Sequence, residues 1–218
     1  MEKNVLFLAT VPSMIVAFNM RNIKMLQDMG YTIHAACNYF ENSAWTEEQL
    51  KEYKQILADN HVVMHQIDFP RKPYHPIQLM RSYSQTRKLL RQINFVMMHN
   101  QSCVSGILGR IAGKKYKMKI IHTEHGFYYF KGSPLFNWIF YPFDRLCSHF
   151  TDAIVTINKD DTAFAEKHMK AKKVVYIPGV GIDVDYYQNT VIDKEQTKQS
   201  IGLPSDSFVV LSVGELNE

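Results

Sequence analysis

The chain has 218 residues, with 25 Lys and Arg against 21 Asp and Glu, and its formal net charge is therefore +4. Hydrophobic residues make up 46% and charged residues 21%, which is the composition of a globular chain that buries a core. These values exclude a disordered chain, a collagen-like repeat and a coiled coil. The length predicts one large domain, alone or followed by a fragment of a second.

The three cysteines, Cys37, Cys103 and Cys147, are far apart and form no C-x-x-C pair. They support neither a disulfide framework nor a structural zinc module, and they favour a reduced, cytoplasmic setting. The first residues lack the basic flank and cleavage site of a signal peptide, and no run approaches the roughly 20 apolar residues that span a bilayer. We expect a soluble or peripheral protein.

The basic residues are spread over several small groups and are not concentrated on one element, so nucleic acid is not an expected partner. Two interpretations of these groups remain open: solvated helix ends and loops, or attraction to an anionic membrane surface or a phosphorylated ligand. The groups lie at residues 71–72, 81–91, 114–119 and 167–173.

Short apolar runs alternate with helical patterns along most of the chain. The pattern predicts strands at residues 4–10, 31–37, 61–67, 95–99, 119–122, 153–157 and 174–177. It predicts helices at residues 15–29, 46–60, 77–93, 102–112, 134–150 and 160–169, with Pro142 as a kink in the fifth. Thr46 and Gln49 predict a capping box, and Gly30 predicts a left-handed helix end.

This alternation predicts an α/β fold with a Rossmann-like, doubly wound and mostly parallel sheet. We assign residues 1–188 to this domain and the polar residues 189–207 to a linker. A further buried strand, Phe208–Val213, is expected to open a second domain, of which residues 208–218 form the start.

Common nucleotide-binding motifs are missing. The sequence has no G-x-x-x-x-G-K-[ST], and Gly179-Val-Gly181 lacks the third glycine of a dinucleotide fingerprint. The turn after the first strand contains Ser13, which either lines a ligand cleft at the carboxyl end of the sheet or simply caps the following helix.

The segment from Ile121 to Gly132 carries the densest chemical signal and begins where a strand ends. It places His122, Glu124 and His125 at the mouth of the sheet, and Gly126 allows a close backbone approach or a positive φ. His125 could donate to a hydroxyl or stabilise developing charge. A metal site at His122 and His125, a hydrolytic His–Glu pair and purely structural histidines remain alternatives.

Several stretches together resemble the acceptor-side half of glycosyltransferase family 4, in its bacterial capsular and exopolysaccharide branch. The resemblance rests on residues 125–127, 131–134, 137–138, 156–161, 176–183 and 209–217. It implies the N-terminal half of a GT-B architecture, in which the N-terminal domain holds the acceptor and the C-terminal domain binds a nucleotide-activated sugar. It also implies transfer that retains the anomeric configuration and needs no metal and no cofactor.

The resemblance implies roles for particular residues. The family's histidine that touches the donor sugar matches His125, which becomes the candidate catalytic residue. The loop beside the donor diphosphate matches Pro12–Met14, and Asn19 stands where this branch often has His. The candidate substrate-binding residues are Ser13, Asn19, Glu124, Gly126, Lys131, Asn158 and Lys159.

The resemblance places the family's phosphate-gripping residues and paired glutamates beyond Glu218. We therefore expect a truncated or split enzyme whose donor domain is encoded separately. Its expected partners are a nucleotide-sugar, a glycan or polyprenyl-linked acceptor and an anionic membrane at the cytoplasmic face, in cell-surface polysaccharide assembly. The alternative is a non-catalytic α/β remnant that binds a glycan or lipid.

Overall fold

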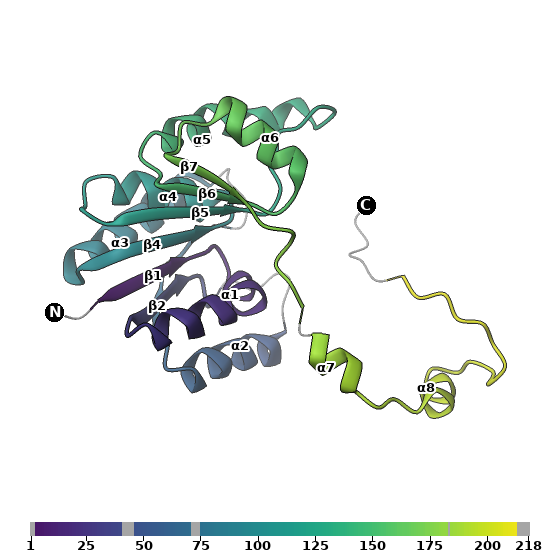
Figure 1. Cartoon of the computed structure of the whole chain (residues 1–218). Coiled ribbons are helices and arrows are strands. Elements are labelled where there is room, and N and C mark those ends of the chain that lie inside the picture. Colours follow the sequence, from purple (N-terminus) through teal and green to yellow (C-terminus); the bar gives the residue numbers. More distant parts are fainter. Residues whose placement is uncertain (1–2, 41–45, 71–74, 183, 213–218) are drawn as a thin grey trace. The chain divides into compact units, whose positions relative to one another are not determined.

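Seven parallel strands form a single sheet in the order β3-β2-β1-β4-β5-β6-β7 (Figure 1). The computed structural model describes residues 3–40, 46–70, 75–182 and 184–212. The strands are β1 (Asn4–Leu8), β2 (Thr32–Cys37), β3 (Val63–Gln66), β4 (Phe95–Gln101), β5 (Lys119–Glu124), β6 (Ala153–Thr156) and β7 (Lys173–Tyr176). The sheet confirms the expected Rossmann-like α/β class, and every strand pair is parallel.

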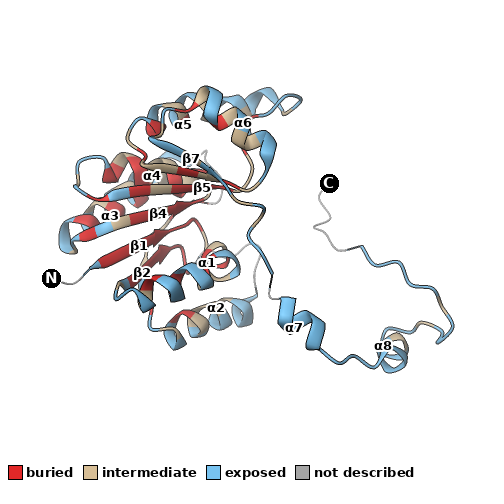
Figure 2. Ribbon diagram, in the orientation of Figure 1, coloured by how far each residue is buried: buried red, intermediate tan, exposed pale blue. Residues whose placement is uncertain are grey.

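Helices connect successive strands, as right-handed crossovers between parallel strands require. They are α1 (Pro12–Asp28), α2 (Glu47–Asp59), α3 (Pro76–Gln92), α4 (Cys103–Gly113), α5 (Phe140–Ser148) and α6 (Lys159–His168). The strands at the middle of the sheet are largely buried, whereas the edge strands β3 and β7 and the outward sides of the helices are more exposed (Figure 2). The predicted capping box at Thr46 and Gln49 is present, and Gly30 has a φ of 83°.

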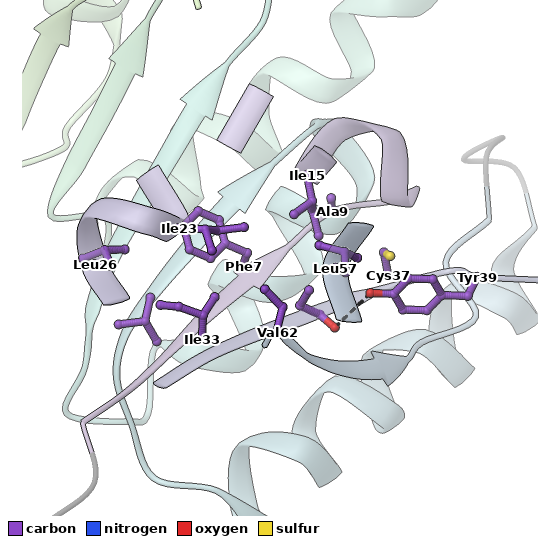
Figure 3. Close-up of a cluster of buried hydrophobic side chains, with 12 residues drawn as sticks. Phe7, Ala9, Ile15, Ile23, Leu26, Ile33, Cys37, Tyr39, Leu57 and Val62 are labelled. Carbon is purple, nitrogen blue, oxygen red and sulfur yellow. Dashed lines mark hydrogen bonds between the residues drawn. The ribbon is translucent and has the colours of Figure 1, made fainter. Parts of the chain in front are cut away.

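Alternate residues of β1 pack into two separate cores, one on each face of the sheet. Val5 and Phe7 lie in the cluster that α1 and α2 cover, together with Ile15, Ile23 and Leu57 (Figure 3). On the opposite face, Leu6 and Leu8 pack in a second cluster with side chains of α3 and α4. Because both faces are covered, the strand needs a continuous apolar sequence.

Helix α4 lies unusually close to the sheet because glycines face the strands. A Cβ atom added at Gly109 would lie 2.3 Å from a methyl carbon of Leu8 and 2.4 Å from Oδ1 of Asn100. A Cβ atom at Gly106 would lie 2.6 Å from the His122 ring. Glycine therefore lets the helix backbone approach side chains at the middle of the sheet.

The segment expected as one kinked helix at residues 134–150 is instead two elements. A 3-10 helix, η1, spans Leu135–Ile139, and α5 begins at Phe140. Pro142 lies in the first turn of α5, where a helix does not need the missing N–H, so it starts a helix and does not kink one. Among the described helices, none is long and apolar enough to cross a membrane.

The chain divides into two compact units, Met1–Val180 and Gly181–Glu218. The second unit contains α7 (Val184–Asn189) and α8 (Lys194–Ser200). The expectation of a buried strand at Phe208–Val213 is wrong for residues 208–212, which have no regular structure, and Phe208 is 92% exposed. A strand gains its hydrogen bonds from a neighbour, and none of the described strands pairs with this segment. Val213 lies outside the described residues, and the boundary expected at residue 188 stays a prediction.

Candidate functional site

The order in which the chain adds strands to the sheet reverses between β1 and β4, and the carboxyl ends of these two strands lie side by side. From β1 the chain proceeds through β2 to β3 on one side, and β4 begins the series on the other. Open α/β sheets bind ligands at such a switch point. Here Thr10, which follows β1, donates its N–H to Oγ of Ser102 at 3.2 Å, and its hydroxyl lies 3.0 Å from the same atom.

Helix α1 starts at this edge of the sheet. Its first residue is Pro12, and Val11 precedes it as the N-cap without a side-chain hydrogen bond. The alternative that Ser13 caps the helix is therefore wrong, because proline at the first position begins the helix two residues earlier than a cap at Ser13 would. Ser13 is 8% exposed and lies in the first turn, near the carboxyl end of β1.

His125 follows the last residue of β5 and is half-buried beside α1. Its Nε2 lies 2.7 Å from Oε1 of Gln101, the last residue of β4. Its ring also packs against Phe18 of α1, with 4.9 Å between the ring centroids. Burial lowers the pKa of His125 and favours the neutral ring. Gly126 follows with a φ of 128°, which is one of the two possibilities that the sequence left open for it.

A polar network on the α1 face joins His125 to Asn19. Nε2 of Gln101 lies 3.3 Å from Oδ1 of Asn19 and 2.9 Å from Nε2 of His99. His99 in turn lies 2.7 Å from Oγ1 of Thr123 on β5. Asn19 is 2% exposed, and both of its polar atoms bond to protein groups. The structure thus brings together Asn19 and His125, two of the predicted site residues.

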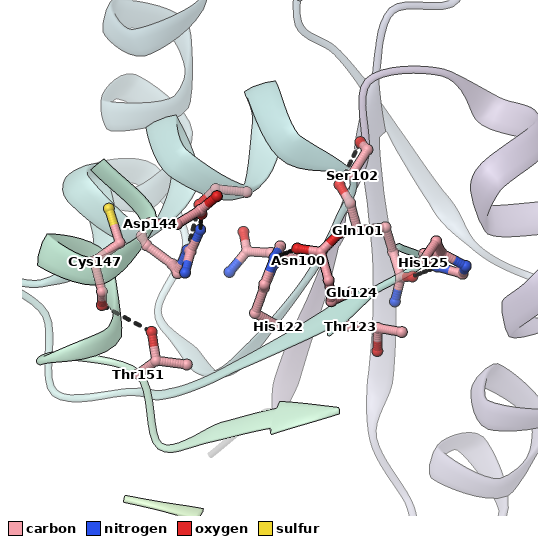
Figure 4. Close-up of polar contacts among 12 residues, drawn as sticks. Asn100, Gln101, Ser102, His122, Thr123, Glu124, His125, Asp144, Cys147 and Thr151 are labelled. Atoms are coloured by element: carbon pink, nitrogen blue, oxygen red, sulfur yellow. Dashed lines mark hydrogen bonds and ion pairs between the residues drawn. The ribbon is translucent and has the colours of Figure 1, made fainter. Parts of the chain in front are cut away.

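A second polar cluster occupies the opposite face, beneath α4 and α5. Nε2 of His122 lies 3.3 Å from a carboxyl oxygen of Glu124, and both side chains are buried. Arg110 pairs with Asp144, which also accepts a hydrogen bond from the Tyr129 hydroxyl at 3.1 Å. Figure 4 shows His122 lying with this cluster, while His125 lies apart from it.

The second cluster holds its titratable groups in their neutral forms, apart from the ion pair. Burial raises the pKa of Glu124 well above its usual value, and repulsion from Asp144 adds to this rise. Burial also lowers the pKa of His122 well below its usual value, and Arg110 adds to the effect. A buried, neutral His–Glu pair under a helix supports the structural interpretation of these two residues.

The metal-site alternative requires the side chains of His122 and His125 to point toward one another. His122 and His125 belong to different clusters and do not converge (Figure 4). Within the described ranges of the chain, no group of three or more His, Cys, Asp or Glu residues is placed to hold a metal ion.

The remaining predicted residues lie on the loops after β5 and β6. Asn158 caps α6, because its Oδ1 accepts the Asp161 N–H at 2.8 Å. Lys159 is the first residue of that helix, and Lys131 is exposed on the loop after β5. In the described part of the chain, no hydrogen bond connects these three residues to the His125 network. Their expected roles in substrate binding stay predictions.

Sequence reasoning missed Gln101, His99 and Phe18. The usable signal was the alternation of β4, where His99 and Gln101 are separated by one residue and therefore share a face of the sheet. Phe18 carried no signal, because its position in α1 fits a helix stripe as well as it fits a ring contact.

A separate cleft of about 650 Å³ opens near the carboxyl ends of β2 and β3. The lining includes the exposed Phe40 ring and an ion pair between Arg81 and Asp68, with 2.8 Å between Nε and Oδ2. The cleft therefore offers one aromatic face together with charged groups.

Comparison with known proteins agrees with this arrangement. The chain is 27% identical over 223 residues to EpsD of Bacillus subtilis (strain 168), which is provisionally named a glycosyltransferase. It is 25% identical over 148 residues to an Escherichia coli UDP-Gal:alpha-D-GlcNAc-diphosphoundecaprenol alpha-1,3-galactosyltransferase. The matches cover 100% and 64% of this chain, but only 54% of EpsD and 37% of the galactosyltransferase.

The fold has solved counterparts. The crystal structure of HepE from Anabaena in complex with UDP-glucose superposes with a TM-score of 0.61 at 13% identity, covering 91% of this chain and 50% of HepE. The sequence model of Glycosyltransferase Family 4 matches residues 19–186, which include Asn19, Gln101 and His125. With a match over most of its length, the chain belongs to Glycosyltransferase Family 4.

Proposed function

We propose that this chain is the acceptor-side domain of a glycosyltransferase that moves a sugar from a nucleotide to a glycan acceptor in cell-surface polysaccharide assembly. The observation that carries the proposal is His125, held at the switch-point edge of a family 4 domain by Gln101 and Phe18. The name of the Escherichia coli relative contains UDP-Gal and a diphosphoundecaprenol-linked sugar, which supports a nucleotide-sugar donor, and HepE, which shares the fold, was crystallised with UDP-glucose.

In the proposed reaction, His125 contacts the donor sugar, and the first turn of α1 lies beside the diphosphate. The nucleotide is bound by a second domain, which begins at about residue 208 after a linker at residues 189–207. The transfer retains the anomeric configuration and uses neither a metal ion nor an organic cofactor. The cleft at Phe40 is suited to the acceptor, because an aromatic face can pack on a sugar ring while Asp68 accepts from hydroxyls.

The test of this proposal is the rate of transfer. In an enzyme that combines this chain with its donor-binding domain, His125→Ala should lower kcat/KM at least about tenfold, which corresponds to the loss of a transition-state contact worth about 1.4 kcal/mol or more. The exposed control His149→Gln should keep the wild-type rate. The 218-residue chain alone should turn over no UDP- or GDP-sugar. Glycan binding with no transfer by the combined enzyme would favour the non-catalytic alternative.

The proposed setting is the cytoplasmic face of a membrane. From the end of β5 into α5 the chain carries a series of exposed apolar side chains, here termed the aromatic surface. It consists of Tyr128, Phe130, Leu135, Phe136, Trp138, Ile139 and Phe143. Aromatic rings favour the bilayer interface, and each nearby basic residue adds about 1 kcal/mol of attraction to anionic lipid.

Liposome binding tests this setting. The protein should co-sediment with anionic vesicles in a salt-sensitive manner, and Leu135→Ser with Phe136→Ser should reduce the bound fraction several-fold. The control Val191→Ser alters an apolar side chain that is 97% exposed in the second unit and should bind as the wild type does. Equal sedimentation with neutral vesicles, or none at low salt, would contradict the membrane setting.

A further inference from the structure

The amide of Asn19 has only one orientation that satisfies its neighbours. Its Nδ2 lies 3.0 Å from the main-chain oxygen of Met14, which can only accept, so the amide nitrogen must face that atom. Oδ1 therefore faces Gln101, and it also accepts a hydrogen bond from Nδ2 of Asn22 at 3.2 Å. A main-chain carbonyl thus sets the direction of this amide.

The orientation of Asn19 determines the orientation of Gln101. The amide nitrogen of Gln101 has two hydrogens, and it uses them toward Oδ1 of Asn19 at 3.3 Å and Nε2 of His99 at 2.9 Å. If the amide were rotated by half a turn, its oxygen would face the Asn19 oxygen, and two acceptors would oppose each other. Oε1 of Gln101 must therefore face His125.

The two histidines then take opposite tautomers. Nε2 of His125 carries a hydrogen, because it lies 2.7 Å from the Gln101 oxygen. Nε2 of His99 carries a lone pair, because it accepts from Gln101 and lies 2.7 Å from the Thr123 hydroxyl. Burial and repulsion from His125 lower the pKa of His99 to about 4, which agrees with a ring that stays neutral.

We propose that Asn19, acting through Gln101, fixes the protonated nitrogen of His125, so that the ring presents Nδ1 to the substrate as an acceptor for a sugar hydroxyl. Asn19 and Gln101 are then positioning residues. The link to transfer rests on the proposed function, whereas the tautomers do not. Among the described residues, no protein group forms a hydrogen bond with Nδ1 of His125. This nitrogen is also not one of the fully buried polar atoms without a partner.

This arrangement gives His125 a chemical preference. A neutral ring with Nε2–H already bonded offers only the lone pair of Nδ1, which accepts from a hydroxyl and repels a phosphate or carboxylate oxygen. Burial keeps the pKa of His125 low and so preserves the neutral form. The contact therefore selects a hydroxyl of the sugar over an oxygen of the diphosphate.

Long-range ¹H–¹⁵N NMR of histidine-labelled 218-residue chain measures the tautomers directly and needs no substrate. At pH 7, His125 should appear as the Nε2–H form and His99 as the Nδ1–H form. The same tautomer on both rings, or His125 with its proton on Nδ1, would overturn the proposal.

Variants identify the residue that sets the tautomers. Asn19→Ala should give mixed tautomers at His99, because the Gln101 amide is then free to rotate. The matched control Asn22→Ala removes another partner of the same Asn19 oxygen and should leave both rings unchanged. Unmixed tautomers in Asn19→Ala would show that Asn19 does not set them.

Gln101→Glu tests the network without truncating a side chain. A carboxylate only accepts and carries charge, so the pKa of His125 should rise by about one unit or more. Gln92→Glu adds the same charge at the exposed end of α3 and should not shift that pKa. An unchanged His125 pKa in Gln101→Glu would contradict the contact. Opposite tautomers in the chain, with no transfer by the combined wild-type enzyme, would refute the proposed function and leave the assignment of the tautomers in place.

Discussion

Asp144→Asn should lower the free energy of unfolding by about 3–5 kcal/mol, because it leaves the Arg110 charge buried without its partner. The side chains of Arg110 and Asp144 are only 1% and 5% exposed. Nε of Arg110 is already committed to the main-chain oxygen of Gly106 at 2.9 Å, so the guanidinium cannot turn toward water without losing that bond as well. Urea titration followed by circular dichroism gives the change directly.

Two controls distinguish the cost of leaving a buried charge unpaired from the cost of removing a charged side chain in general. Asp28→Asn removes a carboxylate from the exposed pair with Lys24, which measures 2.8 Å, and should cost below about 0.5 kcal/mol. Combining Arg110→Met with Asp144→Leu removes both charges and should cost less than Asp144→Asn alone. A loss below about 1 kcal/mol in Asp144→Asn would refute the uncompensated-charge account.

Acidification from pH 6.5 to pH 4.5 should lower the free energy of unfolding by about 2–4 kcal/mol, through histidines that the fold keeps neutral. His34 and His99 have pKa values of about 4 in the folded chain, and burial holds the pKa of His122 well below its usual value. In the unfolded chain these rings titrate near pH 6.5. The unfolded state therefore binds more protons below pH 6.5, and stability is lost as the pH falls toward 4.

Glu124 acts in the opposite direction. Its pKa is raised in the fold, so its neutral carboxyl favours the folded state at acid pH and this contribution is lost as the pH rises. One such group opposes three histidines, and each group contributes at most about 1.4 kcal/mol per pH unit. The net slope therefore keeps the sign set by the histidines.

The His34 environment explains why its ring resists protonation. Nε2 of His34 lies 3.1 Å from Oδ1 of Asn4, and Nδ1 lies 2.9 Å from Nε2 of His65. Since Asn4 donates its amide nitrogen to the main-chain oxygen of Asn94, Oδ1 accepts from His34, and Nδ1 of His34 must accept from His65. Burial lowers the pKa of His34 to about 4, and repulsion from His65 adds to the effect, so the ring stays neutral.

Urea titrations at pH 7, 5.5 and 4.5 measure the pH dependence. His34→Gln should reduce the slope of stability against pH, whereas His149→Gln, at an exposed position, should not. Equal stability of the wild type at pH 7 and pH 4.5 would contradict the prediction.

Much of the fold could be predicted from the sequence, because its patterns are local. The apolar run at β1, the capping box at Thr46 and the alternation of strands with helices each follow from neighbouring residues. The strand prediction failed at residues 208–212 for the same reason: a β-branched apolar run signals a strand, but pairing depends on a neighbour that the run does not specify.

The site was less predictable because its contacts join distant residues. His125 was found from its local motif, yet its partner Gln101 is 24 positions away, and Asn19 is 82 positions from Gln101. The register between β4 and β5 brings Gln101 to His125, and the packing of α1 on the sheet brings Asn19 to Gln101. No local pattern encodes either arrangement.

The two polar clusters also favour the native strand register of the sheet as the chain folds. In the native register, Asn100 lies opposite His122 and Gln101 opposite Thr123. A one-residue slip of β5 would turn every side chain to the other face, and His122 would then point at α1. Each polar group stranded in this way costs about 1–3 kcal/mol, so a misregistered sheet is penalised at several positions at once. Strands with only apolar side chains would lose less free energy in such a slip. The polar residues that orient His125 therefore also destabilise the misregistered sheet.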